Sequence, residues 1–258
     1  MAKSIRKKIT QPHKDTTPGK VDEVEQSERD GSLDQAVTLQ EVLREMGEVY
    51  REDPMKAVRG QGFIKLLHQY IGSQLEARLT TFARRRGIEV VYEAKVLGST
   101  KPKDVDVAVI DPENGPLMLI GVRSQMSSVG KNVLTYYEGV VGECISLQDR
   151  YPMSTHGYVY LHPLQSIKEG KEKESIDHQR YARMYAAVTG RSGPDYKSLR
   201  GIFDHYAYLV VDFDQAPPVL HEELATGAVK NMDLAISTFI ERMVTTFNDR
   251  MLFWDVFE

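Results

Sequence analysis

The stretch DVDVAVIDPENGPLMLIGVRSQ, residues 104–125, decides the fold. It holds two apolar runs, 105–110 and 117–125, separated by a turn rich in proline, asparagine and glycine, which predicts two tightly connected strands. Successive side chains of a strand point to opposite faces. Asp104 and Asp106 therefore share one face of the first strand, and the valines that alternate with them form its apolar face.

Further strands are predicted on both sides of this pair. Residues 88–96 form the preceding strand, and the short connections favour an antiparallel meander of three strands. A helix over residues 133–147 then returns the chain to a strand over residues 157–161. We therefore expect an α/β fold with a mixed central sheet flanked by helices, built in the order αβββαβ.

Helices are also expected before and after this core. One spans residues 38–51, and a second begins at Asp53-Pro54 and ends at Gly87, directly after three arginines. The segments predicted downstream are a helix, a strand and a helix, over residues 176–188, 206–213 and 231–247. Arg191, in a segment rich in glycine and serine, is interpreted as a residue of a solvated loop.

The chain is expected to divide into an arm and a single domain. Residues 1–35 are basic at first, then acidic, and poor in large apolar side chains, which indicates a flexible charged arm. The domain spans residues 36–258. Its predicted parts are a helical N-terminal part, a central core, and a C-terminal part that completes the sheet and the oligomer contacts, over residues 36–86, 87–165 and 166–258.

The composition argues against several classes of protein. The net charge of −4 argues against a nonspecific coat on DNA, which would be basic overall. The single cysteine, Cys144, excludes a disulfide framework and a multi-cysteine zinc site within one chain, and its apolar neighbours indicate a small core residue. With neither a secretory signal nor a transmembrane run evident in the sequence, we expect a cytoplasmic protein without membrane partners.

Polar groups interrupt the two central strands on one face. Asp106 lies between apolar residues, where a carboxylate needs a partner or a cation. The following strand presents Gly121, Arg123 and Gln125 on one face, so a cation and an amide should lie near Asp106. Asp104 is interpreted more simply as a solvated acid where the strand leaves its turn.

The helix over residues 133–147 offers a second carboxylate. Glu138 falls on one helical face with Leu134, Val141 and Ile145, which places it within an apolar stripe. Either it takes part in the site, or it forms a salt bridge to Arg123, or it marks the border of the stripe. Glu143, beside Val140 and Leu147, is a weaker candidate.

This arrangement resembles the PD-(D/E)xK nuclease superfamily. The resemblance rests on the order helix–strand–strand–strand–helix–strand, with an acid on the second strand and a polar pair on the third, and it covers roughly residues 75–161. Residues 122–132, VRSQMSSVGKN, resemble a segment of prokaryotic type II restriction endonucleases. The resemblance implies that residues 36–258 form a nuclease-like domain with its catalytic core at residues 87–165.

The third-strand motif departs from the family pattern. Where the family has an acid, a spacer and a lysine, this chain has Gly121 and Arg123, or in a second alignment Arg123 and Gln125. Some members move the missing carboxylate to the following helix, and Glu138 suits that position. The sequence Glu93-Ala94-Lys95 spells the pattern literally but precedes the Asp106 strand, and we interpret it as a surface pair.

The resemblance implies a reaction and a set of roles. Asp106 and Glu138 would bind Mg²⁺, Arg123 would neutralise charge on the scissile phosphate, and Gln125 would help to position water. Glu76 resembles the auxiliary helix acid of such folds, although its polar neighbours favour an ordinary surface glutamate.

Four polar residues between the third strand and the helix suit contacts to DNA phosphates. They are Ser127, Ser128, Lys131 and Asn132. Capping of the helix is the alternative explanation for Ser128 or Asn132.

The expected activity is that of a Mg²⁺-dependent, sequence-specific endonuclease of the type II restriction kind that cuts double-stranded DNA. A homodimer or higher homo-oligomer would supply one active site for each strand. Gly121 and Arg123 motivate an alternative, a catalytically inactive DNA-binding or regulatory protein on the same fold. A third possibility is an assembly protein in which Asp106, Arg123 and Glu138 form a buried ion network.

Overall fold

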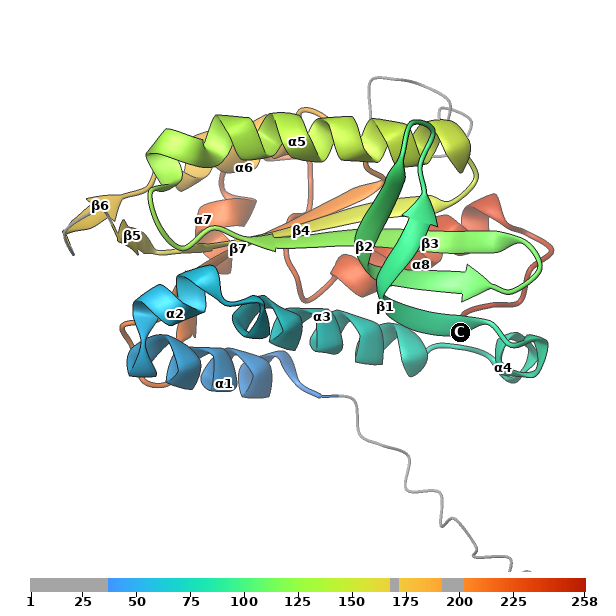
Figure 1. The fold of residues 1–258 in the computed structure, drawn as a ribbon, viewed down its shortest axis with the longest axis horizontal. Coiled ribbons are helices and arrows are strands. Elements are labelled where there is room, and N and C mark those ends of the chain that lie inside the picture. The colour runs from blue at the N-terminus through green and yellow to red at the C-terminus, as the bar shows by residue number, and fades with distance from the viewer. Residues whose placement is uncertain (1–36, 168–171, 192–201) are drawn as a thin grey trace, which may run out of the picture. The chain divides into compact units, whose positions relative to one another are not determined.

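The computed structural model describes residues 37–167, 172–191 and 202–258, and Ala36–Glu258 form one compact unit. The arm predicted over residues 1–35 lies outside the described residues. Within them, a mixed six-stranded sheet is covered by helices on both faces (Figure 1). The expected α/β class is therefore confirmed.

The sheet has an antiparallel half and a parallel half. Its strands, in spatial order, are β1 (Glu89–Leu97), β2 (Pro102–Asp111), β3 (Gly115–Ser124), β4 (Thr155–Pro163), β7 (His205–Asp212) and β8 (Val219–Leu220). The predicted meander is confirmed, because β1, β2 and β3 pair antiparallel. Strands β3, β4 and β7 are parallel, and β8 closes the edge antiparallel. A separate ribbon joins β5 (Gln165–Ile167) to β6 (Lys173–Ser175).

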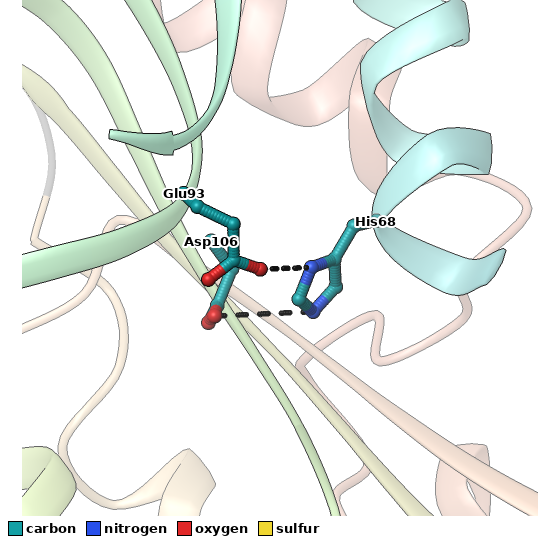
Figure 2. A group of neighbouring side chains, drawn as sticks. All are labelled: His68, Glu93 and Asp106. Atoms are coloured by element: carbon teal, nitrogen blue, oxygen red, sulfur yellow. Dashed lines mark hydrogen bonds and ion pairs between the residues drawn. The ribbon is translucent and has the colours of Figure 1, made fainter. Parts of the chain in front are cut away.

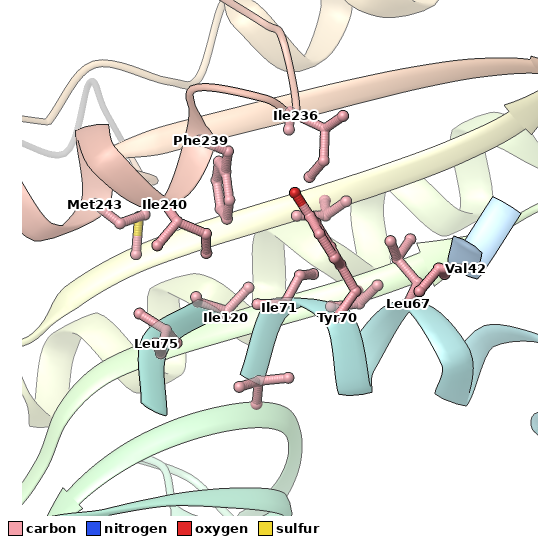
Figure 3. Packing of buried hydrophobic residues seen from close by; sticks show 14 of the residues in the cluster. Val42, Leu67, Tyr70, Ile71, Leu75, Ile120, Ile236, Phe239, Ile240 and Met243 are labelled. Carbon is pink, nitrogen blue, oxygen red and sulfur yellow. The ribbon is translucent and has the colours of Figure 1, made fainter. Parts of the chain in front are cut away.

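One face of the sheet packs against α3 (Gln61–Glu76) and α8 (Phe239–Arg250), with α1 (Leu39–Glu52) against α3. Figure 3 shows this core, where Ile71 and Leu75 of α3 meet Phe239 and Met243 of α8 over Ile120 of β3. The opposite face carries α5 (Val129–Arg150), α6 (His178–Ala186) and α7 (Glu222–Thr226) over a second buried cluster rich in tyrosine. The parallel strands β4 and β7 are thereby buried on both faces, whereas β1 at the antiparallel edge is largely exposed.

Capping residues explain where the N-terminal helices begin. Thr38 and Glu41 form a reciprocal capping box at the start of α1. The carboxylate of Asp53 accepts the backbone N–H of Met55 at 3.0 Å, which starts α2 (Pro54–Arg59) as expected.

The single helix predicted from Asp53-Pro54 to Gly87 is instead three helices, α2, α3 and α4 (Thr81–Arg86). Leu79 leaves the helix to bridge Phe257, and the hydroxyl of Thr80 caps the new helix α4. The predicted end is correct, because Gly87 has the left-handed φ of 80° that terminates α4.

The last predicted helix begins later than expected. Residues 231–238 are not helical, and α8 starts at Phe239. Asp233 accepts the backbone N–H of Ala235 at 2.9 Å and the hydroxyl of Thr238 at 2.6 Å. Such short-range side-chain hydrogen bonds compete with helix formation. The two-residue strand β8 and the five-residue helix α7 are too short to leave a periodic signal.

Arg191 lies outside helices and strands, as expected, but the interpretation that it is solvated is wrong. Its guanidinium is buried and bonds the carbonyl of Ser154 at 2.6 Å and the carboxylate of Asp204 at 3.1 Å. Arg250 of α8 reaches the same carboxylate at 2.6 Å. Asp204 therefore ties the segment before β7 to α8.

No helix in the described ranges has the length and apolar composition needed to cross a bilayer.

Candidate functional site

Strands β2 and β3 separate at Asp106. Their pairing ends at Val107 and Ile120, and Asp106 is the next residue towards the start of β2. Beyond this point a side chain links the two strands, because Asp106 Oδ2 accepts the backbone N–H of Val122 at 2.6 Å. One oxygen of Asp106 is thus committed to β3, and the other is left for a partner.

Asp106 lines a small pocket on the α5 side of the sheet. Arg123 from β3, Glu143 from α5 and Tyr158 from β4 form its other polar walls, and Gly121 contributes to its floor. The pocket holds about 60 Å³, enough for a few water molecules. The structure therefore brings together Asp106 and Arg123, as predicted, but the second carboxylate is that of Glu143.

The environment of Asp106 opposes its negative charge. Burial raises its pKa to about 6, and the nearby carboxylates of Glu93 and Glu143 act in the same direction. The N–H of Val122 and the guanidinium of Arg123 only partly offset this. A buried carboxylate with a raised pKa is stabilised when a cation binds in place of its proton. The pocket is therefore a candidate functional site.

Arg123 is held in place by aromatic side chains. Its Nε donates to the hydroxyl of Tyr158 at 3.1 Å, and its guanidinium lies 5.6 Å from the ring centroid of Tyr136. The Tyr158 ring needs the space above Gly121, where an added Cβ would lie 2.5 Å from a ring carbon. The β3 position that carries an acid in the resembled family is therefore closed to a side chain here.

The expected place of Glu138 in a buried stripe is wrong. Glu138 is exposed, and its stripe partners Leu134 and Ile145 are 53% and 42% exposed. The face of α5 that packs on the sheet consists of other residues, namely Val129, Val133, Val140, Cys144 and Leu147. Glu143 flanks this face and reaches the pocket. Helix α5 has apolar residues on two sides, so periodicity alone does not identify the buried one.

Gln125 shares the sheet face of Arg123, as strand alternation predicts, but its contacts hold the fold together. The side chain is buried and accepts the hydroxyl of Tyr160 at 3.0 Å. Its amide nitrogen lies 3.4 Å from the carbonyl oxygens of both Ser128 and Val129. Gln125 therefore anchors the start of α5 and is not among the residues that line the pocket.

The predicted phosphate contacts lie at the far end of α5. Ser128 precedes the helix, and its distance to Glu143 is fifteen residues, or about 22 Å along the axis at about 1.5 Å per residue. Ser128 has φ 49° and its hydroxyl makes no capping bond, so capping does not explain it. Lys131 is exposed, and Ser127 and Asn132 are half-buried. This group does not join the pocket.

The remaining predicted acids lie at the margins. Asp104 is exposed and borders the pocket. Glu76, at the end of α3, is also exposed and accepts the hydroxyl of Tyr92 at 3.4 Å.

A histidine that sequence reasoning missed faces Asp106 from α3. His68 Nε2 lies 3.8 Å from Asp106 Oδ1, and His68 Nδ1 lies 3.1 Å from Glu93 Oε1 (Figure 2). Burial lowers the pKa of His68, although Glu93 opposes this. The interpretation of Glu93 as part of a surface pair is therefore incomplete, because its carboxylate binds a buried ring. The available signal was a histidine one helical turn from Ile64 and Ile71, on the apolar face of α3.

No family model, curated protein or solved structure matches this chain. The chemistry of the site must therefore be argued from its own residues. They offer carboxylates on two sides of a strand gap, a fixed guanidinium, and a buried imidazole.

Proposed function

We propose that the protein is a divalent-cation-dependent endonuclease that hydrolyses phosphodiester bonds in double-stranded DNA, of the type II restriction kind. The observation that carries the proposal is the gap between β2 and β3, where the carboxylate of Asp106 shares a pocket with Arg123 and Glu143. Glu143 takes the role that the sequence suggested for Glu138.

The residues fit a hard cation such as Mg²⁺. Asp106 and Glu143 would hold it through carboxylate oxygens, which Mg²⁺ prefers, and the raised pKa of Asp106 favours a cation in place of the proton. When bound, Mg²⁺ lowers the pKa of a coordinated water and neutralises phosphate charge.

Arg123 would bind the scissile phosphate. Guanidinium groups match phosphate oxygens in geometry and stay protonated, so Arg123 supplies charge and does not act as a base. The bond from Arg123 Nε to Tyr158 and the nearby Tyr136 ring fix the guanidinium before substrate arrives. Fixed charges of this kind stabilise a transition state without reorganisation.

A homodimer or higher homo-oligomer is part of this proposal, because two strands need two such pockets related by symmetry. The second candidate function is a DNA-binding protein without catalysis. The closed position at Gly121 favours it, since the usual third-strand acid has no room beside Tyr158.

The test compares two glutamates of the same helix. Purified protein is incubated with plasmid and phage DNA in Mg²⁺, with a chelator as the control. We expect discrete fragments from the parent and from Glu138→Gln, and loss of cleavage in Asp106→Asn and Glu143→Gln. Circular dichroism must show that all variants are folded. Intact but shifted DNA with the parent protein would favour the second candidate, and equal cleavage by all variants would place the active site elsewhere.

A further inference from the structure

A second group of ligands meets Asp106 from the opposite face of the sheet. His68 comes from α3, Glu93 from β1 and Asp106 from β2, and one ligand atom of each lies within 4.8 Å of the other two (Figure 2). Glu93 has a φ of 51°, a conformation that is uncommon for a residue with a side chain. This local backbone conformation accompanies a carboxylate that meets the helix.

The buried imidazole is only half satisfied. His68 is 4% exposed, and its Nε2 has no hydrogen-bond partner among the residues that the structure describes. This nitrogen is directed at Asp106, 3.8 Å from Oδ1, which is too long for a hydrogen bond. A buried polar atom without a partner is destabilising. A water molecule or a cation between the ring and the carboxylate would satisfy this nitrogen.

The contact with Glu93 indicates the role of each ring nitrogen. A carboxylate only accepts hydrogen bonds, so Nδ1 of His68 donates to Glu93. In a neutral ring, Nε2 then presents a lone pair to the oxygen of Asp106. Two acceptors cannot bond each other, but both can bind one cation. A carboxylate that fixes a histidine through its other nitrogen is the usual outer partner of a metal-binding imidazole.

The distance between the two acceptors suits a metal ion. Metal bonds to histidine nitrogen and carboxylate oxygen are each about 2.1 Å, so two of them bridge at most about 4.2 Å. The separation of 3.8 Å between Nε2 and Oδ1 falls within this limit. The side chains of Glu93 and Asp106 are 43% and 30% exposed, so an ion bound here would be reached from solvent on their side.

We propose that His68 Nε2 and Asp106 Oδ1 bind a first-row transition metal ion, with Glu93 as the carboxylate that orients His68. Imidazole favours ions of this series, whereas Mg²⁺ binds oxygen ligands. The site shares Asp106 with the proposed nuclease centre but lies on the α3 side of the sheet, and its binding does not require nuclease activity.

The experiment measures Mn²⁺ binding to the metal-free full-length chain by calorimetry and pulsed electron paramagnetic resonance. We expect saturable binding, a nitrogen coupling from one imidazole, and weaker binding of Mg²⁺. His68→Gln should abolish the nitrogen coupling. Glu93→Gln should weaken Mn²⁺ binding by about 10- to 100-fold, as loss of an outer partner does. The side chain of Glu93 is exposed, so we expect this variant to fold.

The matched control is His221→Gln. His221 forms the same kind of pair with Glu223, at 2.8 Å, but within the described part of the chain no third ligand completes a metal-binding group there. This variant should bind Mn²⁺ as the parent does, with the same nitrogen coupling. Unchanged Mn²⁺ affinity and coupling in His68→Gln would overturn the proposal.

Cleavage of DNA measured in parallel separates this site from the proposed function. Binding of Mn²⁺ that depends on His68, without any cleavage, would support the metal site and reject the nuclease. Cleavage that depends on Glu143, with Mn²⁺ binding indifferent to His68, would reject the metal site alone.

Discussion

Gly121 is the position at which the structure makes its sharpest stability prediction. A Cβ added there would lie 2.5 and 2.6 Å from two ring carbons of Tyr158, which is closer than Cβ atoms approach in folded proteins. The ring is buried, with Phe203 at 5.4 Å and Tyr185 at 6.4 Å between centroids, so it has little room to withdraw. Gly121→Ala should therefore overpack the core.

The size of the effect follows from the contact. Overpacking of a well-filled core costs about 1–3 kcal/mol. For a domain of this size, each kcal/mol lowers the melting temperature by about 2–4 °C. The matched control is Gly142→Ala on α5, where an added Cβ meets nothing within 4 Å. Because alanine is favoured over glycine inside a helix, this control should gain about 0.5–1 kcal/mol.

Urea and thermal unfolding of the two variants test the reasoning. Gly121→Ala should be less stable than the parent, and Gly142→Ala more stable. Combining Gly121→Ala with Tyr158→Leu should reduce the cost of the alanine, with a coupling of about 0.5–3 kcal/mol. An unchanged or higher stability of Gly121→Ala would show that Tyr158 does not occupy the space beside Gly121, and the argument for a closed third-strand position would fail.

Three further predictions concern buried groups. Burial raises the pKa of Asp106 to about 6, so ionisation of this group destabilises the folded state. In urea unfolding in metal-free buffer, the stability of Asp106→Asn relative to the parent should therefore increase as pH rises from about 4 to about 7. A stability difference that does not change with pH would contradict this. Cys144 is buried and burial raises its pKa, so a thiol reagent at pH 8 should label it much more slowly in the folded protein than in urea; equal rates would place it at the surface. Asp204→Asn removes the charge that pairs with Arg191 and Arg250, and should cost about 3–5 kcal/mol in unfolding free energy; a loss below about 1 kcal/mol would mean that the network is dispensable.

The strands were predictable because alternation and turn residues are local signals. The two apolar runs on either side of Asp111-Pro112 favour a hairpin, and β2 and β3 match them closely. Helix ends were predictable where the sequence has a residue type that caps helices, as at Thr38 and Gly87. The break at Leu79 was not, because it depends on pairing with Phe257 at the other end of the chain.

The site was predictable only in part, for a related reason. Strand alternation placed Asp106 and Arg123 near one another, and the structure brings both to one pocket. Helical periodicity favours Glu138 over Glu143, but both sides of α5 carry apolar residues, and only packing on the sheet decides which side is buried. His68 lies far from Asp106 in sequence, and its contact depends on how α3 crosses β2.

The two halves of the sheet differ in how far along the chain their partners lie. The hairpins of β1, β2 and β3 pair residues that are near neighbours in sequence, whereas β5, β6 and α6 lie between β4 and its partner β7. Closing the longer loop loses more chain entropy, so we expect the meander to gain structure before β7 docks. Asp106 and Arg123 belong to the meander, whereas Tyr158 lies on β4, which pairs with β3 on one side and with β7 on the other. Tyr158 would then fix Arg123 only after β4 has joined the sheet, and a chain that has formed the meander alone would present Asp106 beside an arginine that is not yet held in place.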